Sequence, residues 1–585
     1  MVKKIFGQML LTQIVSSVTV MICMLVDSIL IGRYLGINAM TAYGLTSPLL
    51  LVFVSLGTIL SNGIQVICGK RIGCGDKEGT NACFTLSVLT AGVVAGAGLI
   101  IVLVFCGPIC TLLGAGNPVP DNEVYFLTKN YLLGFIIGAP AFIFAQIMVP
   151  YMQLSGNRLR LVVAVAALTV GDIVFDLLNV FVFHGGILGM GIASSLSYYI
   201  AFFIGGAYFV KKNCLFQFTK AGLSRKLLGE LIHQAIPTVV NQISCILLAF
   251  CMNRLLLAID GNLAVAAYSV ISTLGNFCYC VGSGIGAVAM TLGAIFYGDE
   301  DRESLYTVVR TMVQYALRII SVVVLVILIF APRIVALFLA DNPEAVSLAA
   351  TGLRLFSLSL FFSPINVAFK YYYQGVHRNR FAEMIAFLSS FLLPVLFSFV
   401  LSRFLQTTGI WLGWVCGEAM TLLVTSLLVW SRNRKISLQA EAYAMLPAAF
   451  GARREDCLDL SVHTADEAMQ ASEQASVFCR EHDLDERSCL LIPLCIEEMV
   501  MNIVDHGFTK DERKDHSIEV RLMLKEEKRM IRIRDNCVNF DPVSYVKLHE
   551  DDDPTAHFGI RMIMKMVTDA NYVSSLGLNN LTLVM

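Results

Sequence analysis

Three aspartates lie inside otherwise apolar stretches of this sequence. Asp27 is part of VTVMICMLVDSILIG, and Asp172 and Asp176 are part of LTVGDIVFDLLNVFVF. Insertion scales assign about 2.5–3.5 kcal/mol to an ionised aspartate at the centre of a membrane helix. Carboxyl groups placed there at such a cost indicate a site that uses them.

Asp172 and Asp176 are four residues apart, so a helix places them on one face. Two carboxylates that close do not both ionise easily, which suits the pair to taking up and releasing a proton. The same oxygens could instead hold Na⁺. We therefore predict that Asp27, Asp172 and Asp176 form a coupling site for H⁺ or Na⁺. In the alternative interpretation all three are structural, with Asp27 anchored near the outer membrane surface beside Arg33.

A second set of chemically suited residues lies near the C-terminus. In LLIPLCIEEMVMNIVDHGF (490–508), Glu498 and Asn502 share one face of a predicted helix, an arrangement suited to Mg²⁺ and phosphate. The stretches DNCVNFDP (535–542) and HEDDDPTAHFGIRMI (549–563) follow. Gly559 in the latter precedes a helical pattern, where backbone N–H groups can bind phosphate.

Composition separates these two sets into different parts of the chain. Of the 585 residues, 56% are hydrophobic and 15% are charged, whereas soluble domains carry about 25% charged residues. Residues 1–440 contain 27 Lys and Arg against 17 Asp and Glu, and residues 441–585 contain 16 against 27. An apolar, basic-flanked membrane part is thus followed by an acidic soluble part, and we expect no nucleic-acid partner. The absence of a G-x-x-x-x-G-K-[ST] motif argues against a P-loop pump.

Apolar windows long enough to cross a bilayer occur about twelve times. Their predicted limits are 10–32, 46–68, 85–107, 129–151, 160–182, 189–210, 234–258, 266–296, 315–339, 350–373, 383–403 and 408–430. Most Lys and Arg fall in alternate connecting loops, on the side that also receives both chain ends. The positive-inside rule then predicts that both termini are cytosolic.

The two halves of the membrane part resemble each other at an offset of about 220–226 residues. VDSILIGRYLGINAMTAYGL (26–45) matches MNRLLLAIDGNLAVAAYSV (252–270), and YMQLSGNRLR (151–160) matches YYYQGVHRNR (371–380). Six spans in each half give the repeats the same orientation. We predict two six-helix lobes, 1–220 and 221–435, which face a central cavity as in transporters.

The order and spacing of these stretches resemble the multidrug and toxic compound extrusion (MATE) transporters over roughly residues 5–430. In that family an Asp at the position of Asp27 and an Asn-x-x-x-Asp pair form the cation site of the first lobe. Here the pair has Asp172 where Asn is usual, which adds a negative charge and leaves the choice between H⁺ and Na⁺ open. Family members that bind Na⁺ in the second lobe carry acids on spans seven and ten. This chain has Asn366 and Lys370 on span ten, so no second-lobe cation site is expected.

After a linker, 436–454, strand and helix patterns alternate through residues 455–585, which predicts an α+β sandwich with its own core. This region resembles the GHKL, or Bergerat, ATPases, and most closely the anti-sigma-factor serine kinases. The resemblance implies that Glu498 is a general base and that Asn502 binds Mg²⁺. It also implies that Asp535 accepts a hydrogen bond from the adenine of ATP and that Gly559 lies near the phosphates.

Two departures from the GHKL pattern bear on this assignment. Cys537 and Asn539 stand where glycines are usual, and an acidic run, Glu550–Asp553, would repel phosphate. Glycine often supplies a positive φ, which cysteine adopts poorly. The alternative is therefore a degenerate domain kept for protein contacts.

Together these features predict a bacterial cytoplasmic-membrane antiporter that exports small organic, cationic, drug-like compounds in exchange for H⁺ or Na⁺ by alternating access. The expected partners are the substrate, the bilayer, ATP with Mg²⁺, a cytosolic regulatory protein and a second copy bound through the C-terminal domain. One alternative is a membrane-anchored serine kinase whose transporter-like part is a sensor. Another is a flippase for lipid-linked precursors.

Overall fold

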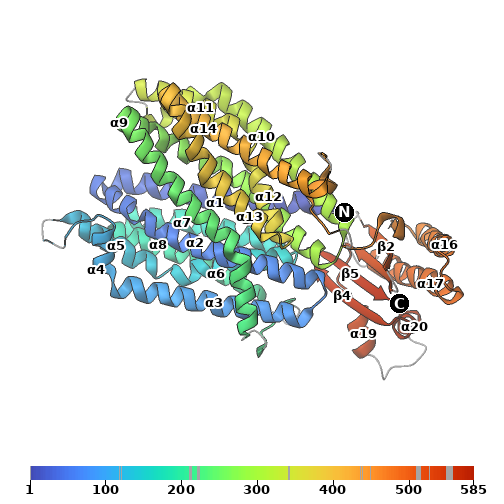
Figure 1. Cartoon of the computed structure of the whole chain (residues 1–585). Coiled ribbons are helices and arrows are strands. Elements are labelled where there is room, and N and C mark those ends of the chain that lie inside the picture. Colours follow the sequence, from blue (N-terminus) through green and yellow to red (C-terminus); the bar gives the residue numbers. More distant parts are fainter. Residues whose placement is uncertain are drawn as a thin grey trace.

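Long apolar helices form a bundle, and a small sheet with its own helices lies against one end of it (Figure 1). The computed structural model describes residues 2–117, 119, 122–209, 214–220, 224–339, 343–434, 436–437, 439–447, 450–508, 516–525, 528–548 and 558–585. Both chain ends lie at the end of the bundle that carries the sheet, which we call the domain end.

The first half of the bundle contains helices α1 to α8. Their bounds are α1 Val2–Leu30, α2 Ile37–Gly73, α3 Lys77–Val104, α4 Cys106–Leu112, α5 Glu123–Ile136, α6 Ala139–Leu154, α7 Arg158–Leu178 and α8 Gly186–Phe209. Two short π-helical turns, Ile31–Leu35 and Asn179–Phe183, extend α1 and α7.

The second half contains helices α9 to α14. Their bounds are α9 Arg225–Gly298, α10 Arg302–Leu339, α11 Pro343–Ser359, α12 Ser363–Gly375, α13 Asn379–Phe387 and α14 Leu393–Asn433. A π-helical turn, Leu388–Leu392, joins α13 to α14. The short helix α15, Ala440–Tyr443, lies in the linker.

The described helices account for the twelve predicted spans. Nine runs are long and apolar enough to cross a membrane, and the bent pairs α5–α6 and α11–α12 raise the number to eleven. The run 379–433 reverses at Gln406, whose φ of 48° and ψ of −132° are not helical. Its two arms pack closely, since a Cβ on Gly413 would lie 2.2 Å from Ser398 Oγ. Counting those arms separately gives the twelfth span.

The C-terminal domain is a five-stranded antiparallel sheet with helices on one face. Its strands, in the order β1-β2-β3-β5-β4, are β1 Cys457–Val462, β2 Ile518–Lys525, β3 Lys528–Asp535, β4 Asp569–Ser575 and β5 Leu578–Val584. The helices are α16 Ala465–Glu481, α17 Glu486–Asn502, α19 Pro542–Leu548 and α20 Phe558–Met566, and a π turn, Ile503–Gly507, follows α17.

Successive side chains along each strand point to opposite faces of the sheet. Ile531 and Ile533 on β3 share a core with Ile496 of α17 and Ile563 of α20. The intervening residues of β3 point to the opposite face, which is turned toward the bundle (Figure 1). β2 and β3 form an antiparallel hairpin, and the predicted α+β sandwich is confirmed.

Candidate functional site

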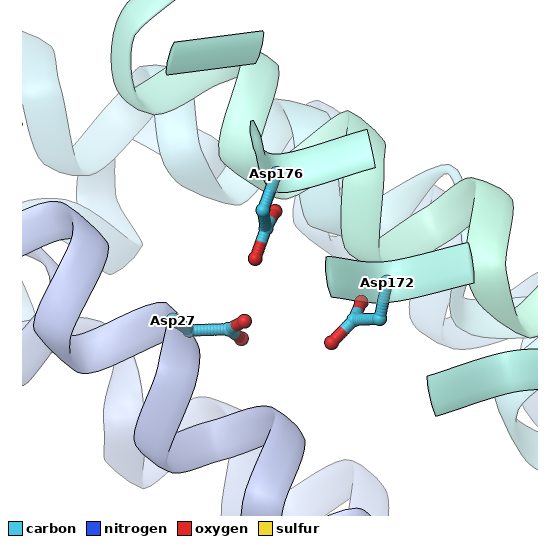
Figure 2. A group of neighbouring side chains, drawn as sticks. All are labelled: Asp27, Asp172 and Asp176. Atoms are coloured by element: carbon cyan, nitrogen blue, oxygen red, sulfur yellow. The ribbon is translucent and has the colours of Figure 1, made fainter. Parts of the chain in front are cut away.

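Asp27 on α1 faces Asp172 and Asp176 on α7 (Figure 2). One carboxylate oxygen of each residue lies within 4.8 Å of the corresponding oxygens of the other two, and all three residues are buried. We call this group the acidic cluster. The structure thus brings together the three aspartates that the sequence singled out.

The acidic cluster has few hydrogen-bond donors around it. Ser197 Oγ on α8 donates to Asp172 Oδ1 at 2.9 Å. Asp27 Oδ1 and both carboxylate oxygens of Asp176 have no hydrogen-bond partner within the described part of the chain. Buried carboxylates without partners are costly unless they are neutralised. The oxygen-only donor set therefore suits a proton or a small hard cation.

Both helices that carry the cluster widen shortly beyond it. Asp27 precedes the π turn Ile31–Leu35, and Asp176 precedes the π turn that begins at Asn179. Asn179 Nδ2 donates to Gly186 O at 2.9 Å and ties this turn to α8. Single π turns inside helices are frequent at functional sites.

A cavity of about 450 Å³ lies between the two halves, next to the acidic cluster. Met21 of α1 and Tyr198 of α8 line it, close in sequence to Asp27 and Ser197. The volume falls in the range of about 300–1,000 Å³ that is usual for small-molecule sites. Its described lining consists of aromatic, methionine, aliphatic and uncharged polar side chains, and none of these is acidic or basic.

A charged side chain, Lys370 on α12, lies behind this lining. Its Nζ donates to Asn241 Oδ1 at 2.8 Å and to the Tyr279 hydroxyl at 3.3 Å, and both partners line the cavity. Deeper in the second half, Asn366 Nδ2 donates to Glu418 Oε2 at 2.7 Å. A lysine and a carboxylate are thus both buried in the second half of the bundle.

In the C-terminal domain, Glu498 and Gly559 come together although they are far apart in sequence. A Cβ added to Gly559 would lie 2.2 Å from Glu498 Oε2, so the start of α20 closely approaches the Glu498 carboxylate. Asn502 Nδ2 donates to Glu498 O at 2.7 Å, which commits only the amide nitrogen. The Asn502 side-chain oxygen is therefore the atom suited to hold Mg²⁺.

Asp535, at the end of β3, is buried and hydrogen-bonded. Its Oδ1 accepts from Cys537 N at 2.9 Å and from Asn579 Nδ2 at 2.8 Å. Tyr572 donates its hydroxyl to Asn579 Oδ1 at 2.8 Å and so orients the asparagine. Burial raises the pKa of Asp535 above its usual range, while the bond from Cys537 N opposes that rise. Both named bonds end on Oδ1.

The structure removes one objection raised by the sequence. Neither Cys537 nor Asn539 has a positive φ, so their backbone does not need glycine. The segment that follows Asp535 is therefore free of backbone strain at Cys537 and Asn539. The acidic run Glu550–Asp553 lies outside the described residues.

Comparison with known families identifies the family of the membrane part. The family model MatE matches residues 13–178 and 237–410, together more than half of the chain. This chain belongs to the MatE family. The model for the histidine kinase-like ATPase domain matches residues 462–585, which contain Glu498, Asn502, Asp535 and Gly559.

Curated relatives match about two thirds of this chain. The multidrug export protein MepA of Staphylococcus haemolyticus is 24% identical over 68% of this chain and 86% of its own length. The probable multidrug resistance protein YoeA of Bacillus subtilis is 23% identical over 70% of this chain and 90% of its own length.

Solved structures share the fold of the bundle. An outward-facing multidrug resistance MATE transporter superposes with a TM-score of 0.67 at 21% identity, over 74% of this chain and 96% of its own. A MOP superfamily transporter from Pyrococcus furiosus, described as having a binding pocket of reversed polarity, superposes with a TM-score of 0.68 at 20% identity, over 76% of this chain and 97% of its own.

Sequence reasoning missed two residues that contact the predicted aspartates. Ser197 and Asn579 each bond to a predicted aspartate from another element. A weak signal existed for Ser197, because serines recur through the apolar stretch of α8. No local signal marks Asn579, which reaches Asp535 only through the pairing of β3 with β5.

Proposed function

We propose that this MatE protein is an antiporter of a bacterial cytoplasmic membrane that exports small organic compounds in exchange for H⁺ or Na⁺. The acidic cluster is the coupling site, and both termini are cytosolic. The observation that carries the proposal is the set of buried carboxylate oxygens of Asp27 and Asp176 that have no partner among the described residues. They lie beside a cavity of the size of a drug-like molecule.

Alternating access would follow from the ion's preference for one arrangement of the two halves. A ligand shifts a conformational equilibrium only by its differential affinity for the two states. With the cluster neutralised, α1 and α7 can approach each other. With it charged, carboxylate repulsion and desolvation favour an arrangement that admits water. Ion entry down its gradient and substrate exit therefore use the two arrangements in turn.

The C-terminal domain binds ATP with Mg²⁺ in this proposal. Asn502 would hold Mg²⁺, Asp535 would accept from the adenine amino group, and Glu498 would act as the general base if phosphate is transferred. When bound, ATP supplies a transferable phosphoryl group. We assign this domain a regulatory role, since the proposed coupling site lies in the membrane part.

Efflux from proteoliposomes tests the antiporter proposal. Ethidium, a cation, and norfloxacin, a zwitterion, serve as probes under separately imposed proton and sodium gradients. We expect gradient-driven efflux of at least one probe by the unaltered protein and its loss in Asp27→Asn. Glu418→Gln, which removes a buried carboxyl of the second half, is the matched control. Efflux that survives in Asp27→Asn but is lost in Glu418→Gln would move the coupling site to the second half.

A further inference from the structure

The face of the C-terminal sheet that bears no helices is covered by the bundle. Residues of β2 and β3 that alternate with the domain core point to this face and meet the loop between α9 and α10. We call Asp299, Glu300 and Asp301 the docking loop. The docking loop belongs to the second half of the bundle. Figure 1 shows the sheet lying against the domain end of the bundle.

Arginines from the sheet pair with the docking loop. Arg532 Nη2 lies 3.0 Å from Asp299 Oδ1, and Arg534 Nη1 lies 2.9 Å from Asp301 Oδ2. Arg534 also pairs with Asp299, and Arg521 pairs with Asp301. Both aspartates and both β3 arginines are at most 8% exposed. Buried charges of this kind are tolerated only when they are paired, so the contact is specific.

The first half of the bundle is attached to a different part of the domain. Leu576 N, between β4 and β5, donates to Leu154 O at the end of α6 at 2.9 Å. Lys77, at the start of α3, lies 3.2 Å from Asp541 Oδ2, and Val573 of β4 joins the bundle core. One small domain therefore holds both halves.

The halves also meet each other beneath the domain. A Cβ on Gly73 of α2 would lie 2.0 Å from Ile295 O of α9, and Cys74 Sγ donates to Gly298 O at 3.2 Å. These helices belong to different halves. The bundle is therefore closed at the domain end in this structure, and the domain spans the closure.

We propose that the sheet of the C-terminal domain is a clamp that binds loops of both halves and holds the transporter closed at the domain end, and that nucleotide binding by this domain loosens the clamp. Opening toward the domain requires the halves to separate, which breaks either the docking-loop contact or the Lys77–Asp541 and Leu154–Leu576 contacts. The transport consequence rests on the proposed antiporter function. The response to nucleotide rests on the proposed binding of ATP by the domain, and the clamp itself rests on neither.

The link to nucleotide comes from where the first-half contact lies. Asp541 belongs to the same short segment as Asp535, the proposed adenine acceptor. Its carboxylate accepts from the backbone N–H groups of Val543 and Ser544 at 3.0 Å each and so caps α19, while it pairs with Lys77. A base bound against Asp535 reorders this segment and displaces Asp541 from Lys77. The docking-loop contact lies on β2 and β3 and is affected less.

The docking-loop contact is built to be reversible. Arg532 Nε and Nη1 are buried without a hydrogen-bond partner among the described residues. A cavity of about 350 Å³ beside Arg532 separates part of the sheet from α10. The interface is thus incompletely packed, which lowers the cost of separating it relative to a protein core.

Zero-length cross-linking of the full chain in nanodiscs tests the clamp. A carbodiimide joins a lysine amine to a carboxylate in contact with it, so Lys77–Asp541 reports on the first-half contact and Lys525–Glu300 on the second-half contact. Yields are measured by mass spectrometry without nucleotide and with AMP-PNP and Mg²⁺. We expect both cross-links without nucleotide, and with it a fall of about fivefold in the Lys77–Asp541 yield, as for a typical allosteric coupling. In Asp535→Asn the same fall should require about tenfold more nucleotide.

A charge reversal and its rescue keep the test independent of folding defects. Asp299→Lys should reduce the Lys525–Glu300 yield and increase the rate of gradient-driven efflux. Asp299→Lys combined with Arg534→Glu should restore both in part, because Arg534 pairs with Asp301 as well as with Asp299. Glu303→Lys makes the same charge change in the first turn of α10, at a residue that forms no ion pair with a described residue, and should change neither.

Each failure has a distinct meaning. Absence of both cross-links from the unaltered protein overturns the clamp. Cross-links that ignore AMP-PNP, whether the nucleotide binds or not, overturn its control by nucleotide. Efflux that is unchanged in Asp299→Lys while the cross-link is lost overturns its effect on transport. If no variant shows efflux but the cross-links respond to AMP-PNP, the clamp stands and the antiporter proposal fails.

Discussion

The aspartates of the acidic cluster and those of the docking loop are about equally buried, with between 0% and 8% of each residue exposed. Their partners differ. Asp299 and Asp301 pair with Arg532, Arg534 and Arg521, whereas the described side-chain donors to the acidic cluster are the neutral groups of Ser197 and Cys23. Buried carboxyl groups thus serve two purposes in one chain. Those with arginine partners join the domain to the bundle, and those without are the groups that we propose to exchange an ion.

The largest expected difference is in transport. Asp176→Asn keeps the side-chain shape but removes the exchangeable charge, so gradient-driven efflux should fall by about tenfold or more, since proton-relay carboxyls in membranes are functional by default. The measurement is efflux from proteoliposomes at matched protein density. Asp299→Asn should retain gradient-driven efflux. Equal losses in both variants would show that the acidic cluster and the docking loop do not differ in their role in transport.

The second largest difference is expected in the stability of the docked C-terminal domain. Asp299→Asn leaves Arg532 and Arg534 short of a counter-charge, and breaking a buried pair in this way costs about 3–5 kcal/mol. The Lys525–Glu300 cross-link should weaken and the thermal transition of the C-terminal domain should move to lower temperature. Glu300→Gln, at a pair whose side chains are 30% and 49% exposed, should lower that transition far less. An equal shift in the two variants would show that burial does not decide the strength of the contact.

Asp535 is an intermediate case, because it is buried and bonded by two neutral donors rather than by arginines. Asp535→Asn should weaken nucleotide binding by about tenfold, the value of one hydrogen bond to a charged group. Titration of the full-length protein with a fluorescent ATP analogue measures the affinity. Glu519→Gln, on β2 away from the nucleotide residues, serves as the control. An unchanged affinity in Asp535→Asn would remove this residue from the base site.

In the acidic cluster, replacing an aspartate with asparagine should raise stability, whereas the same change in the docking loop should lower it. Removing a buried charge without partners relieves a desolvation cost, so Asp176→Asn should raise the midpoint of unfolding of the membrane part, equivalent to about 1 kcal/mol. Thermal unfolding in detergent at neutral pH measures this. A lower midpoint in Asp176→Asn would mean that the carboxylate has a stabilising partner.

The smallest expected effect is that of pH on docking. Burial alone would raise the pKa of Asp301, but the charges of Arg534, Arg521 and Arg532 outweigh it and hold the pKa well below its usual range. A carboxyl with a lowered pKa contributes stability that is complete above its unfolded value, about 3.9, and is lost only as pH falls through the folded value. Docking should therefore not change between pH 8 and about pH 5.

Energy transfer between fluorophores fused to the two chain ends can follow docking across that range. Both ends lie at the domain end of the bundle, so undocking would lower the transfer efficiency (Figure 1). A fall in transfer between pH 8 and pH 5 would show that the Asp301 contact titrates at an ordinary pKa.

Much of this organisation could be predicted from local patterns. The spans, the reversal at the α9–α10 loop and the α+β domain follow from apolar length and from helix and strand periodicity. The placement of Asp172 and Asp176 on one face followed from their spacing of four. The structure also shows that Tyr372 and Tyr373, in an aromatic-rich stretch, donate to the carbonyl oxygens of Ala444 and Tyr443 in the linker, at 3.3 and 3.0 Å. No periodicity predicts those contacts.

The sequence by itself determined which groups carry charge and which segments must be buried, because both depend on residue type and on short spacings. Only the tertiary structure decided which of the buried charges are paired. Asp301 and Arg534 are 233 residues apart, and their neighbours in sequence do not show that they meet. The same holds for Asp27 and Asp176, whose lack of a described partner is a property of the assembled helices. Electrostatic pairing depends on distance in space, and the folded chain alone sets that distance.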